Sequence, residues 1–292
     1  MAQYSIKDIE VLSGIKAHTL RIWELRYALL KPERTDTNIR YYSDEQLKKI
    51  LNVSLLNRKG YKISKIAGMS DAELKREVTE ITDQHQTPDD LLDALTQSMV
   101  DFDEAKFEKF LSVAIAKHGF ENAFTQIVFP FLTRTGILWS TGAILPVQEH
   151  FISNLIRRKV IVAIDSQFLT ENRHTSRFLL FLPEGETHEL MLLFIEYIFR
   201  KNNQRVAYIG SSLPFSDIDI VNKTFNPHYL VTYITVPMQD PTLQVFINNL
   251  SKAFPRKTIM IGGAQMQLQK PKLPSNVKAI DSMEQMLRLM HS

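Results

Sequence analysis

The sequence predicts a multidomain α and α/β protein, and three observations lead to this fold class. The chain has 292 residues, enough for about two or three separate cores. Apolar residues recur at helical spacing through its first 170 residues or so, and strand-like and helix-like runs alternate after that. We therefore expect a winged helix-turn-helix head, a four-helix bundle and a doubly wound parallel sheet of the Rossmann-like kind.

The head, residues 1–72, begins with two short helical patterns. Ser5 is a candidate N-cap for the first pattern, and Gly14 interrupts it. The pattern resumes over residues 16–27, with Leu20, Trp23 and Tyr27 on one face. Two short helices around a glycine-containing turn predict a helix-turn-helix.

A wing and a third helix complete the predicted head. Residues 30–42 are polar, contain Pro32 and end in strand-forming residues, as a β-wing would. Residues 43–46, Ser-Asp-Glu-Gln, are a typical helix start, and Gly60 ends the apolar pattern that follows. Residues 73–87 are polar and are expected to form a linker.

The middle segment, residues 88–172, carries four amphipathic helical patterns and therefore predicts a helix bundle. They begin near Leu91, Phe102, Ala123 and Glu149. The last segment, residues 176–292, predicts a parallel sheet. Its expected strands are 178–182, 206–210, 229–235, 258–262 and 277–280, and its expected helices are 188–201, 215–225, 240–253 and 282–291.

Composition limits the function classes. The chain has no cysteine, which excludes disulfides and thiolate metal sites and fits a reducing compartment. We find no signal peptide and no run of about 18 apolar residues, so we expect a cytoplasmic protein that does not span a membrane. Residues 1–70 contain 13 Lys and Arg against 7 Asp and Glu, whereas residues 71–90 are acidic. A basic head followed by an acidic segment indicates that the head binds a polyanion.

The head resembles the MerR family of transcription factors over nearly its whole length. The resemblance is carried by residues 19–27, TLRIWELRY, and by residues 38–44, NIRYYSD. The resemblance implies binding to double-stranded operator DNA. Cationic, hydroxyl and aromatic side chains of the second helix and the wing are suited to contact its phosphates and base edges. Trp23 and one of the wing tyrosines have core packing as an alternative role. The candidate DNA-binding residues are Lys16, His18, Thr19, Arg21, Arg26, Tyr27, Arg34, Arg40, Tyr41 and Tyr42.

The bundle carries a second resemblance. Trp139 is followed after nine residues by Glu149 and His150, a pattern similar to that of light-responsive, cobalamin-dependent repressors of the CarH and LitR type. The resemblance implies that Trp139 shields the upper face of a corrinoid and that the Glu-His pair lies near the same face. Without this context, a Trp and a Glu-His pair have packing and a helix cap as their ordinary roles.

The last segment resembles cobalamin-binding domains through three ordered markers. The first is the histidine loop, residues 183–191, in which Glu186 and His188 match the pattern Asp-x-His-x-x-Gly. The second is the strand end at Tyr233, and the third is the pair Gly262-Gly263. The resemblance implies that His188 ligates cobalt and that the glycines allow close approach of a ligand. The implied cofactor is adenosylcobalamin or another cobalamin.

Two residues depart from that family pattern. Met191 stands where the family has glycine, and Tyr233 where it has serine, and both would narrow the slot that takes the cobalamin nucleotide tail. Three readings remain open. The tail binds differently, the domain has lost cobalamin, or it holds another ligand.

The sequence therefore predicts a DNA-binding transcriptional regulator, a repressor with a corrinoid-type sensor. In the resembled family, adenosylcobalamin promotes an oligomer that binds DNA, and light reverses this. The alternative is a MerR-type regulator whose sensor domain has become an oligomerisation or protein-binding module. A homodimer or homotetramer is expected, since one small head contacts too few base pairs. An enzyme, namely a corrinoid methyltransferase or mutase subunit, is disfavoured because such enzymes have no reason to carry a helix-turn-helix head, and we find no other catalytic constellation.

Overall fold

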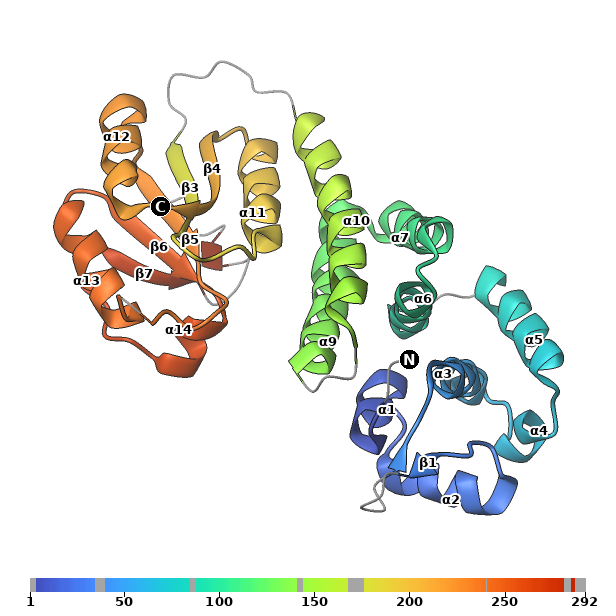
Figure 1. Ribbon diagram of the computed structural model, residues 1–292. Coiled ribbons are helices and arrows are strands. Elements are labelled where there is room, and N and C mark those ends of the chain that lie inside the picture. Colours follow the sequence, from blue (N-terminus) through green and yellow to red (C-terminus); the bar gives the residue numbers. More distant parts are fainter. Residues whose placement is uncertain are drawn as a thin grey trace. The chain divides into compact units, whose positions relative to one another are not determined.

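The computed structural model describes residues 4–34, 40–84, 88–140, 144–167, 176–239, 241–280 and 285–286 (Figure 1). The chain divides into two compact units, Met1–Leu155 and Ile156–Ser292. The first unit contains both the predicted head and most of the predicted bundle. The boundary between the units falls within one long helix, α10 (Pro146–Asp165).

The head has the predicted helix-turn-helix and wing. Ser5 caps α1 and Ser43 caps α3, each in a reciprocal capping box with the third helical residue, as their sequence context predicts. The wing is an antiparallel pair in which Glu33 lies opposite Tyr41. The elements are α1 (Ile6–Ser13), α2 (Ala17–Tyr27), β1 (Glu33–Arg34), β2 (Arg40–Tyr41), α3 (Asp44–Arg58), α4 (Ile63–Ala67) and α5 (Asp71–Gln84).

The segment predicted as a linker, 73–87, is mostly helical. Helix α5 runs to Gln84 and packs on α3, with Lys49 Nζ 3.1 Å from an oxygen of Asp71. Leu74 is buried and anchors α5. The prediction of a linker was wrong here because acidic composition is compatible with a helix that buries only a narrow stripe.

The bundle helices follow in sequence. They are α6 (Pro88–Asp101), α7 (Glu104–His118), α8 (Phe120–Ala123), the π-helix η1 (Phe124–Val128), α9 (Phe129–Ser140) and α10. The predicted third helix is thus a continuous run of α, π and α turns. Side chains of α3 and α6 join the head to the bundle, because Arg58 Nη2 lies 2.5 Å from Asp93 Oδ2 and Lys59 Nζ lies 2.7 Å from Asp90 Oδ2.

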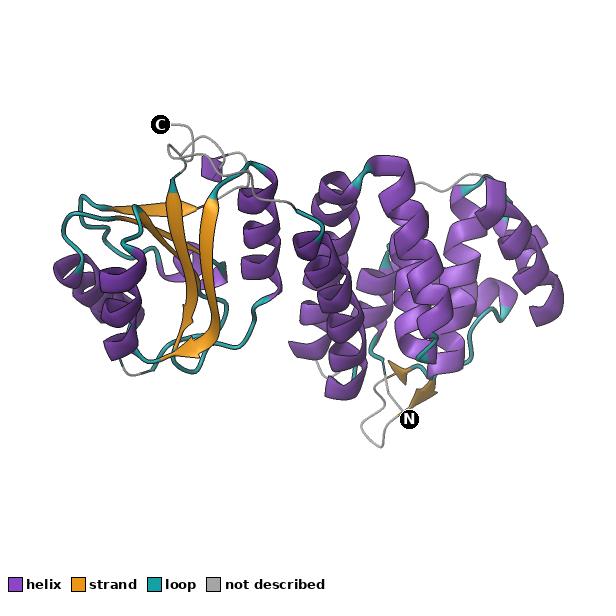
Figure 2. Ribbon diagram, turned by 90° about the horizontal axis from the view of Figure 1, so that it is seen from above, coloured by secondary structure: helices purple, strands orange, loops and turns teal. Residues whose placement is uncertain are grey.

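The second unit is a five-stranded parallel sheet with helices on both faces (Figure 2). The strand order is β4-β3-β5-β6-β7. The strands are β3 (Arg177–Pro183), β4 (Arg205–Leu213), β5 (Tyr229–Tyr233), β6 (Thr258–Gly262) and β7 (Val277–Ile280), and the helices are α11 (Leu190–Lys201), α12 (Phe215–Phe225), α13 (Leu243–Ala253) and α14 (Ala264–Gln269).

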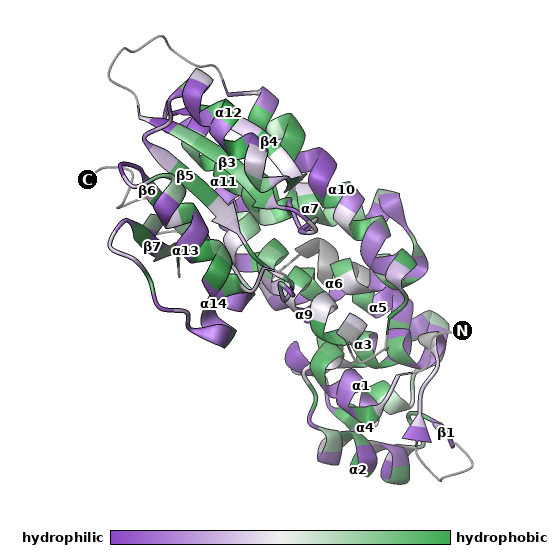
Figure 3. Ribbon diagram, turned by 60° about the vertical axis from the view of Figure 1, so that its left-hand side comes forward, coloured by the Kyte–Doolittle hydropathy of each residue, from purple (hydrophilic) through white to green (hydrophobic). Residues whose placement is uncertain are grey.

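All five predicted strands are present, and the buried strands β3, β5 and β6 form the hydrophobic centre of the second unit (Figure 3). One core cluster lies between the sheet and the helices α12 and α13, and it includes Leu179, Ile234 and Phe246. Helix α14 has no counterpart in the sequence prediction. The predicted helix 282–291 lies outside the described residues except for 285–286. Within the described part of the chain, no helix combines the length and apolar character needed to cross a membrane.

Candidate DNA-binding surface and histidine loop

The turn between α1 and α2 is built around Glu10. Gly14 adopts φ 71°, which glycine tolerates without strain, and its N–H donates to the Glu10 carbonyl at 2.9 Å. The Glu10 carboxylate then accepts the backbone N–H of Ala17 at 3.0 Å and pairs with Lys16 Nζ at 2.9 Å. The hydrogen bonds from Lys16 and Ala17 lower the pKa of Glu10. Glu10 therefore caps α2, a role that the sequence interpretation missed because the two residues belong to different helices.

Helix α2 has one buried and one exposed face. Leu20 and Trp23 are buried, which confirms Trp23 as a core residue. His18, Arg21 and Arg26 are exposed, and Thr19 and Tyr27 are half-buried. The exposed side of α2 thus presents three of the candidate DNA-binding residues to solvent.

The wing is fastened to α2 through Glu24. Tyr42 is fully buried and its hydroxyl donates to Glu24 Oε1, while Arg40 Nε lies 3.6 Å from Glu24 Oε2. Burial and the Glu24 carboxylate raise the pKa of Tyr42. Tyr42 is therefore the core tyrosine of the wing, and its assignment as a DNA contact is corrected. Its ring supports the position of β2 instead.

The other wing candidates remain at the surface. Arg34 is exposed, and Tyr41 is half-buried with its hydroxyl donating to Glu33 at 2.5 Å. Arg40 is partly exposed despite its pairing with Glu24. Arg34, Arg40 and Tyr41 therefore stay candidates for contacts to the DNA backbone.

In the bundle, Trp139 lies near the end of α9 and is 53% exposed. Glu149 and His150 lie in the first part of α10, where His150 Nε2 is 3.6 Å from Glu149 Oε2. That separation is too long for a hydrogen bond. Glu149 instead accepts a hydrogen bond from the Ser153 hydroxyl one helical turn later. The carboxylate therefore does not fix the His150 ring in this structure.

The histidine loop is organised by Glu186. Its carboxylate is buried at the carboxyl end of β3, and Oε1 accepts the His188 N–H at 2.9 Å and lies 2.7 Å from His188 Nδ1. Oε2 accepts the N–H groups of Thr235 and Val236, at 2.7 Å and 3.0 Å, from the loop after β5. One carboxylate thus joins two loops at the edge of the sheet where open α/β folds bind ligands.

These hydrogen bonds also set the charge of the site. Burial raises the pKa of Glu186, but hydrogen bonds from the His188 ring and from the N–H groups of His188, Val236 and Thr235 outweigh it and lower the pKa to about 2. An ionised carboxylate places the neutral His188 ring proton on Nδ1. The Nε2 lone pair is then the one suited to a metal ion, which is the usual arrangement of carboxylate-supported histidine ligands.

The two glycines at the end of β6 each have a close neighbour in the protein itself. Gly262 pairs with Tyr233 across strands, and a Cβ on Gly262 would lie 2.6 Å from the Tyr233 ring. Gly263 has φ 112°, and a Cβ there would lie 2.1 Å from the Ile234 carbonyl oxygen. The close approaches that the sequence interpretation assigned to a ligand are thus made by Tyr233 and Ile234.

The site therefore suits the cobalt centre of a cobalamin but not its nucleotide tail. Glu186 and His188 provide a supported nitrogen ligand for cobalt. The Tyr233 ring, which would narrow the slot that the resemblance assigns to the nucleotide tail, lies against Gly262. Met191 lies half-buried in the first turn of α11. In this conformation His188 suits a cobalt ligand, and the Tyr233 ring fills the place of a buried nucleotide tail.

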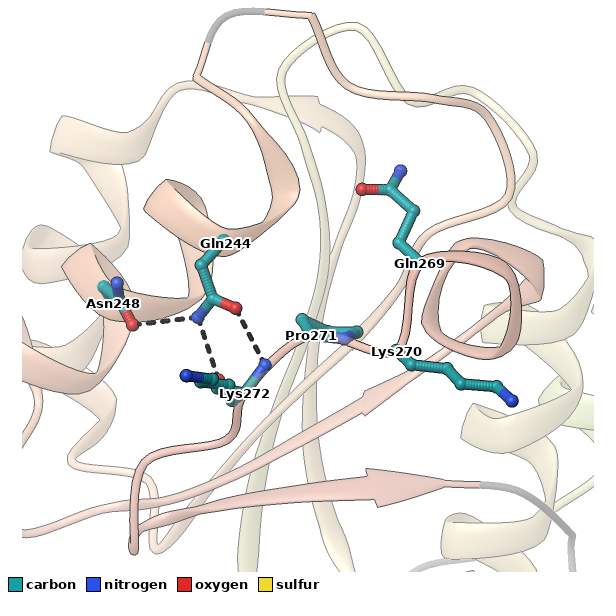
Figure 4. Close-up of a pocket in the computed structure, with 6 residues that line it drawn as sticks. All are labelled: Gln244, Asn248, Gln269, Lys270, Pro271 and Lys272. Carbon is teal, nitrogen blue, oxygen red and sulfur yellow. Dashed lines mark hydrogen bonds between the residues drawn. The ribbon is translucent and has the colours of Figure 1, made fainter.

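Two hollows accompany the sheet. One, of about 460 Å³, lies at the carboxyl ends of β3 to β5 beside Gly185 and Glu186, with Phe215, Ile234 and Phe246 in its wall. Another, of about 530 Å³, lies between α13 and residues 269–272 and is bridged by Gln244, whose side chain bonds to the backbone of Lys272 (Figure 4). The second hollow contains none of the predicted site residues. Among the described residues, no three His, Asp or Glu side chains gather as a metal site.

Comparisons with known proteins agree with both halves of this picture. Residues 4–73 match the model of MerR HTH family regulatory proteins, and residues 91–163 match the model of the B12 binding domain. The chain is a MerR-type DNA-binding regulator with a cobalamin-type sensor domain. This confirms the resemblances found in the head and in the bundle.

The regulator is similar to named repressors over most of its length. It is 25% identical to the HTH-type transcriptional repressor CarH of Myxococcus xanthus over 89% of each chain. It is 26% identical to the repressor CarA of the same organism over 72% of this chain and 68% of CarA. Its head alone is 38% identical to the regulator MlrA of Escherichia coli, over 23% of this chain and 27% of MlrA.

A solved structure of a corrinoid protein resembles most of this chain in fold. The monomethylamine corrinoid protein of Methanosarcina barkeri superposes with a TM-score of 0.54 at 12% identity, covering 70% of this chain and 98% of that protein. At this identity the likeness concerns the fold alone. The predicted order of a helical segment followed by a cobalamin-binding type of sheet is thereby confirmed.

Proposed function

We propose that this regulator is a transcriptional repressor whose binding to double-stranded operator DNA is controlled by a corrinoid at His188. The carrying observation is the 2.7 Å contact between Glu186 and His188 Nδ1 at the ligand-binding edge of the sheet. The Glu186 carboxylate, whose pKa is lowered, orients the His188 imidazole. A charged, oriented pair of this kind at the ligand-binding edge of a sheet is typical of a binding site. We propose adenosylcobalamin as the natural form, with its nucleotide tail outside the space that the Tyr233 ring fills.

The chain's own residues divide the work. Glu186 holds the loop after β3 against the loop after β5, so a ligand at His188 contacts a preset frame. When bound, a corrinoid would supply a cobalt centre, which the His188 ring would hold. Trp139 and His150 are exposed on the bundle, and their roles toward a corrinoid stay predictions from the resemblance. We assign the chain no catalytic step.

The test is an absorbance spectrum of the purified full-length protein after incubation with adenosylcobalamin in the dark and gel filtration. The wild-type protein is expected to retain a visible corrinoid band, and the His188→Ala variant is expected to lose most of it. The His228→Ala variant is the matched control, since this exposed histidine directly precedes β5 and lies at the opposite end of the strands from His188. A wild-type protein that retains no corrinoid would overturn the proposal.

Oligomerisation is part of the proposal. A repressor with one small head per chain needs two heads on paired half-sites, so a homodimer or homotetramer is the DNA-binding form. A ligand changes such an assembly only by binding one state better than the other. Illumination of the corrinoid-loaded protein is expected to change its size in light scattering, and the apoprotein is the control.

A second candidate function is favoured by one observation, the Tyr233 ring against Gly262. In this reading the sensor domain binds no cobalamin and serves as an oligomerisation or protein-binding module. The double variant Met191→Gly, Tyr233→Ser decides between the two. If the variant binds cobalamin and the wild type does not, the second candidate holds. If both bind it equally, Tyr233 is no obstacle and the second candidate fails.

A further inference from the structure

The exposed face of α2 is not uniformly polar. Ile22 is 49% exposed and Leu25 is 87% exposed, and they lie three residues apart. Residues at this spacing are neighbours on a helix surface. Together they form what we call the apolar ridge, defined as Ile22 and Leu25. It lies opposite the buried face that contains Leu20 and Trp23.

The ridge has charged and polar neighbours on the same helix. His18 precedes Ile22 by four residues and Leu25 by seven, so it continues the same stripe toward the start of α2. Arg21 and Arg26 are exposed on the two sides of the stripe. The arrangement is an apolar line bordered by cations.

A single exposed leucine on a protein surface is ordinary and needs no explanation. Here two large aliphatic side chains stand side by side on the second helix of a helix-turn-helix, the element that enters the major groove. The bordering arginines suit the phosphates on both sides of that groove. The charge pattern therefore identifies the groove of DNA as what covers the ridge.

Only one apolar group is presented at the base edges of the major groove, the 5-methyl group of thymine. We propose that Ile22 and Leu25 recognise thymine methyl groups in the operator, and so determine part of its sequence. Arg21 and Arg26 position the helix through the phosphates. This inference rests on DNA binding by the head and adds the chemical feature that the head reads.

The experiment compares thymine with uracil, which pairs identically and lacks only the methyl group. An operator is first selected from a randomised duplex library by the full-length protein, in the ligand state that binds DNA. Its affinity is then measured with thymine and with uracil in the same sequence. Each methyl that the ridge contacts is expected to contribute about fourfold in affinity, the value of one buried methyl-sized group.

Three variants make the test specific. Leu25→Ala is expected to reduce the thymine-to-uracil affinity ratio toward one, because the partner of the methyl is gone. Arg26→Ala is expected to weaken binding to both DNAs alike and to lower the salt slope by about one. Ile220→Ala, which removes a 64% exposed isoleucine on α12, is the control for loss of an exposed aliphatic side chain.

The outcomes are separable. A protein that selects no DNA under any condition contradicts the regulatory function itself. DNA binding with equal affinity for thymine and uracil overturns the ridge proposal and leaves the regulatory function intact. A Leu25→Ala variant that changes oligomer size without DNA, with an unchanged thymine-to-uracil ratio, would mean that a second copy covers the ridge, and it too overturns the proposal.

Discussion

The chain contains two Glu-His pairs that look alike in sequence and differ in structure. In the histidine loop, the Glu186 carboxylate is buried, accepts backbone N–H groups from two loops and contacts His188 Nδ1 at 2.7 Å. In the bundle, Glu149 lies 3.6 Å from His150, whose side chain is 72% exposed. The difference teaches that a carboxylate orients a histidine only where the backbone first orients the carboxylate.

The largest effect should come from removing the buried carboxylate. Glu186→Ala leaves the N–H groups of His188, Thr235 and Val236 without their acceptor. We expect the free energy of unfolding to fall by about 3 kcal/mol, since each unsatisfied buried donor is costly. Urea denaturation of the full-length protein measures this. A loss below that of Glu149→Ala would erase the contrast between the two pairs.

The next effect concerns ligand binding. Glu186→Gln keeps the size of the side chain and an acceptor oxygen but removes the charge that orients the His188 ring. We expect corrinoid affinity to fall by about 10–100-fold, the usual effect of losing the partner of a metal-binding histidine. Titration followed by absorbance measures it. Glu149→Gln is the control, and an equal loss in that variant would contradict the distinction.

The stability of the protein should fall at acid pH because of the Glu186 carboxylate. The pKa of Glu186 is lowered from 4.5 to about 2 in the folded protein. Its contribution to stability is therefore complete above pH 4.5 and is lost as the pH falls from 4.5 toward 2. Urea midpoints measured on both sides of pH 4.5 should show this slope in the wild type. The slope should be shallower in Glu186→Gln, and an unchanged slope would assign it to other groups.

The smallest effect should come from removing the Glu149 carboxylate in the bundle. Glu149→Ala removes a partly exposed carboxylate whose hydrogen bond is to the Ser153 hydroxyl. We expect the free energy of unfolding to change by about 0.5 kcal/mol or less, as for most surface substitutions. Thermal unfolding monitored by circular dichroism is sensitive enough for the comparison. If Glu149→Ala lowered the free energy of unfolding as much as Glu186→Ala does, the expected difference between the two carboxylates would be wrong.

Much of the fold could be predicted because strong local patterns control it. Ser5 and Ser43 cap helices as their sequence context predicts, and apolar runs produced all five strands. Helix α14 was missed because six residues with little apolar periodicity give no signal. Helix α5 was missed because its acidic composition resembled that of a linker.

The site could be predicted only in part. His188 and Glu186 were found because their spacing is local. The packing of Tyr233 on Gly262 depends on the register between β5 and β6, which sequence spacing does not fix. For the same reason Tyr42 could not be separated from Tyr41 until the wing was seen folded against Glu24.

The π-helix η1 is a place where the bundle absorbs one extra residue of chain length. A π turn holds one residue more than the α-helix around it, as a single inserted residue would leave behind. Deleting one residue from 124–128 would let the helix close into regular α turns and would keep Trp139 on the same side of α9. The same deletion within α9 would rotate the indole by about 100° around the helix axis. The direction of that indole therefore depends on the number of residues between η1 and Trp139.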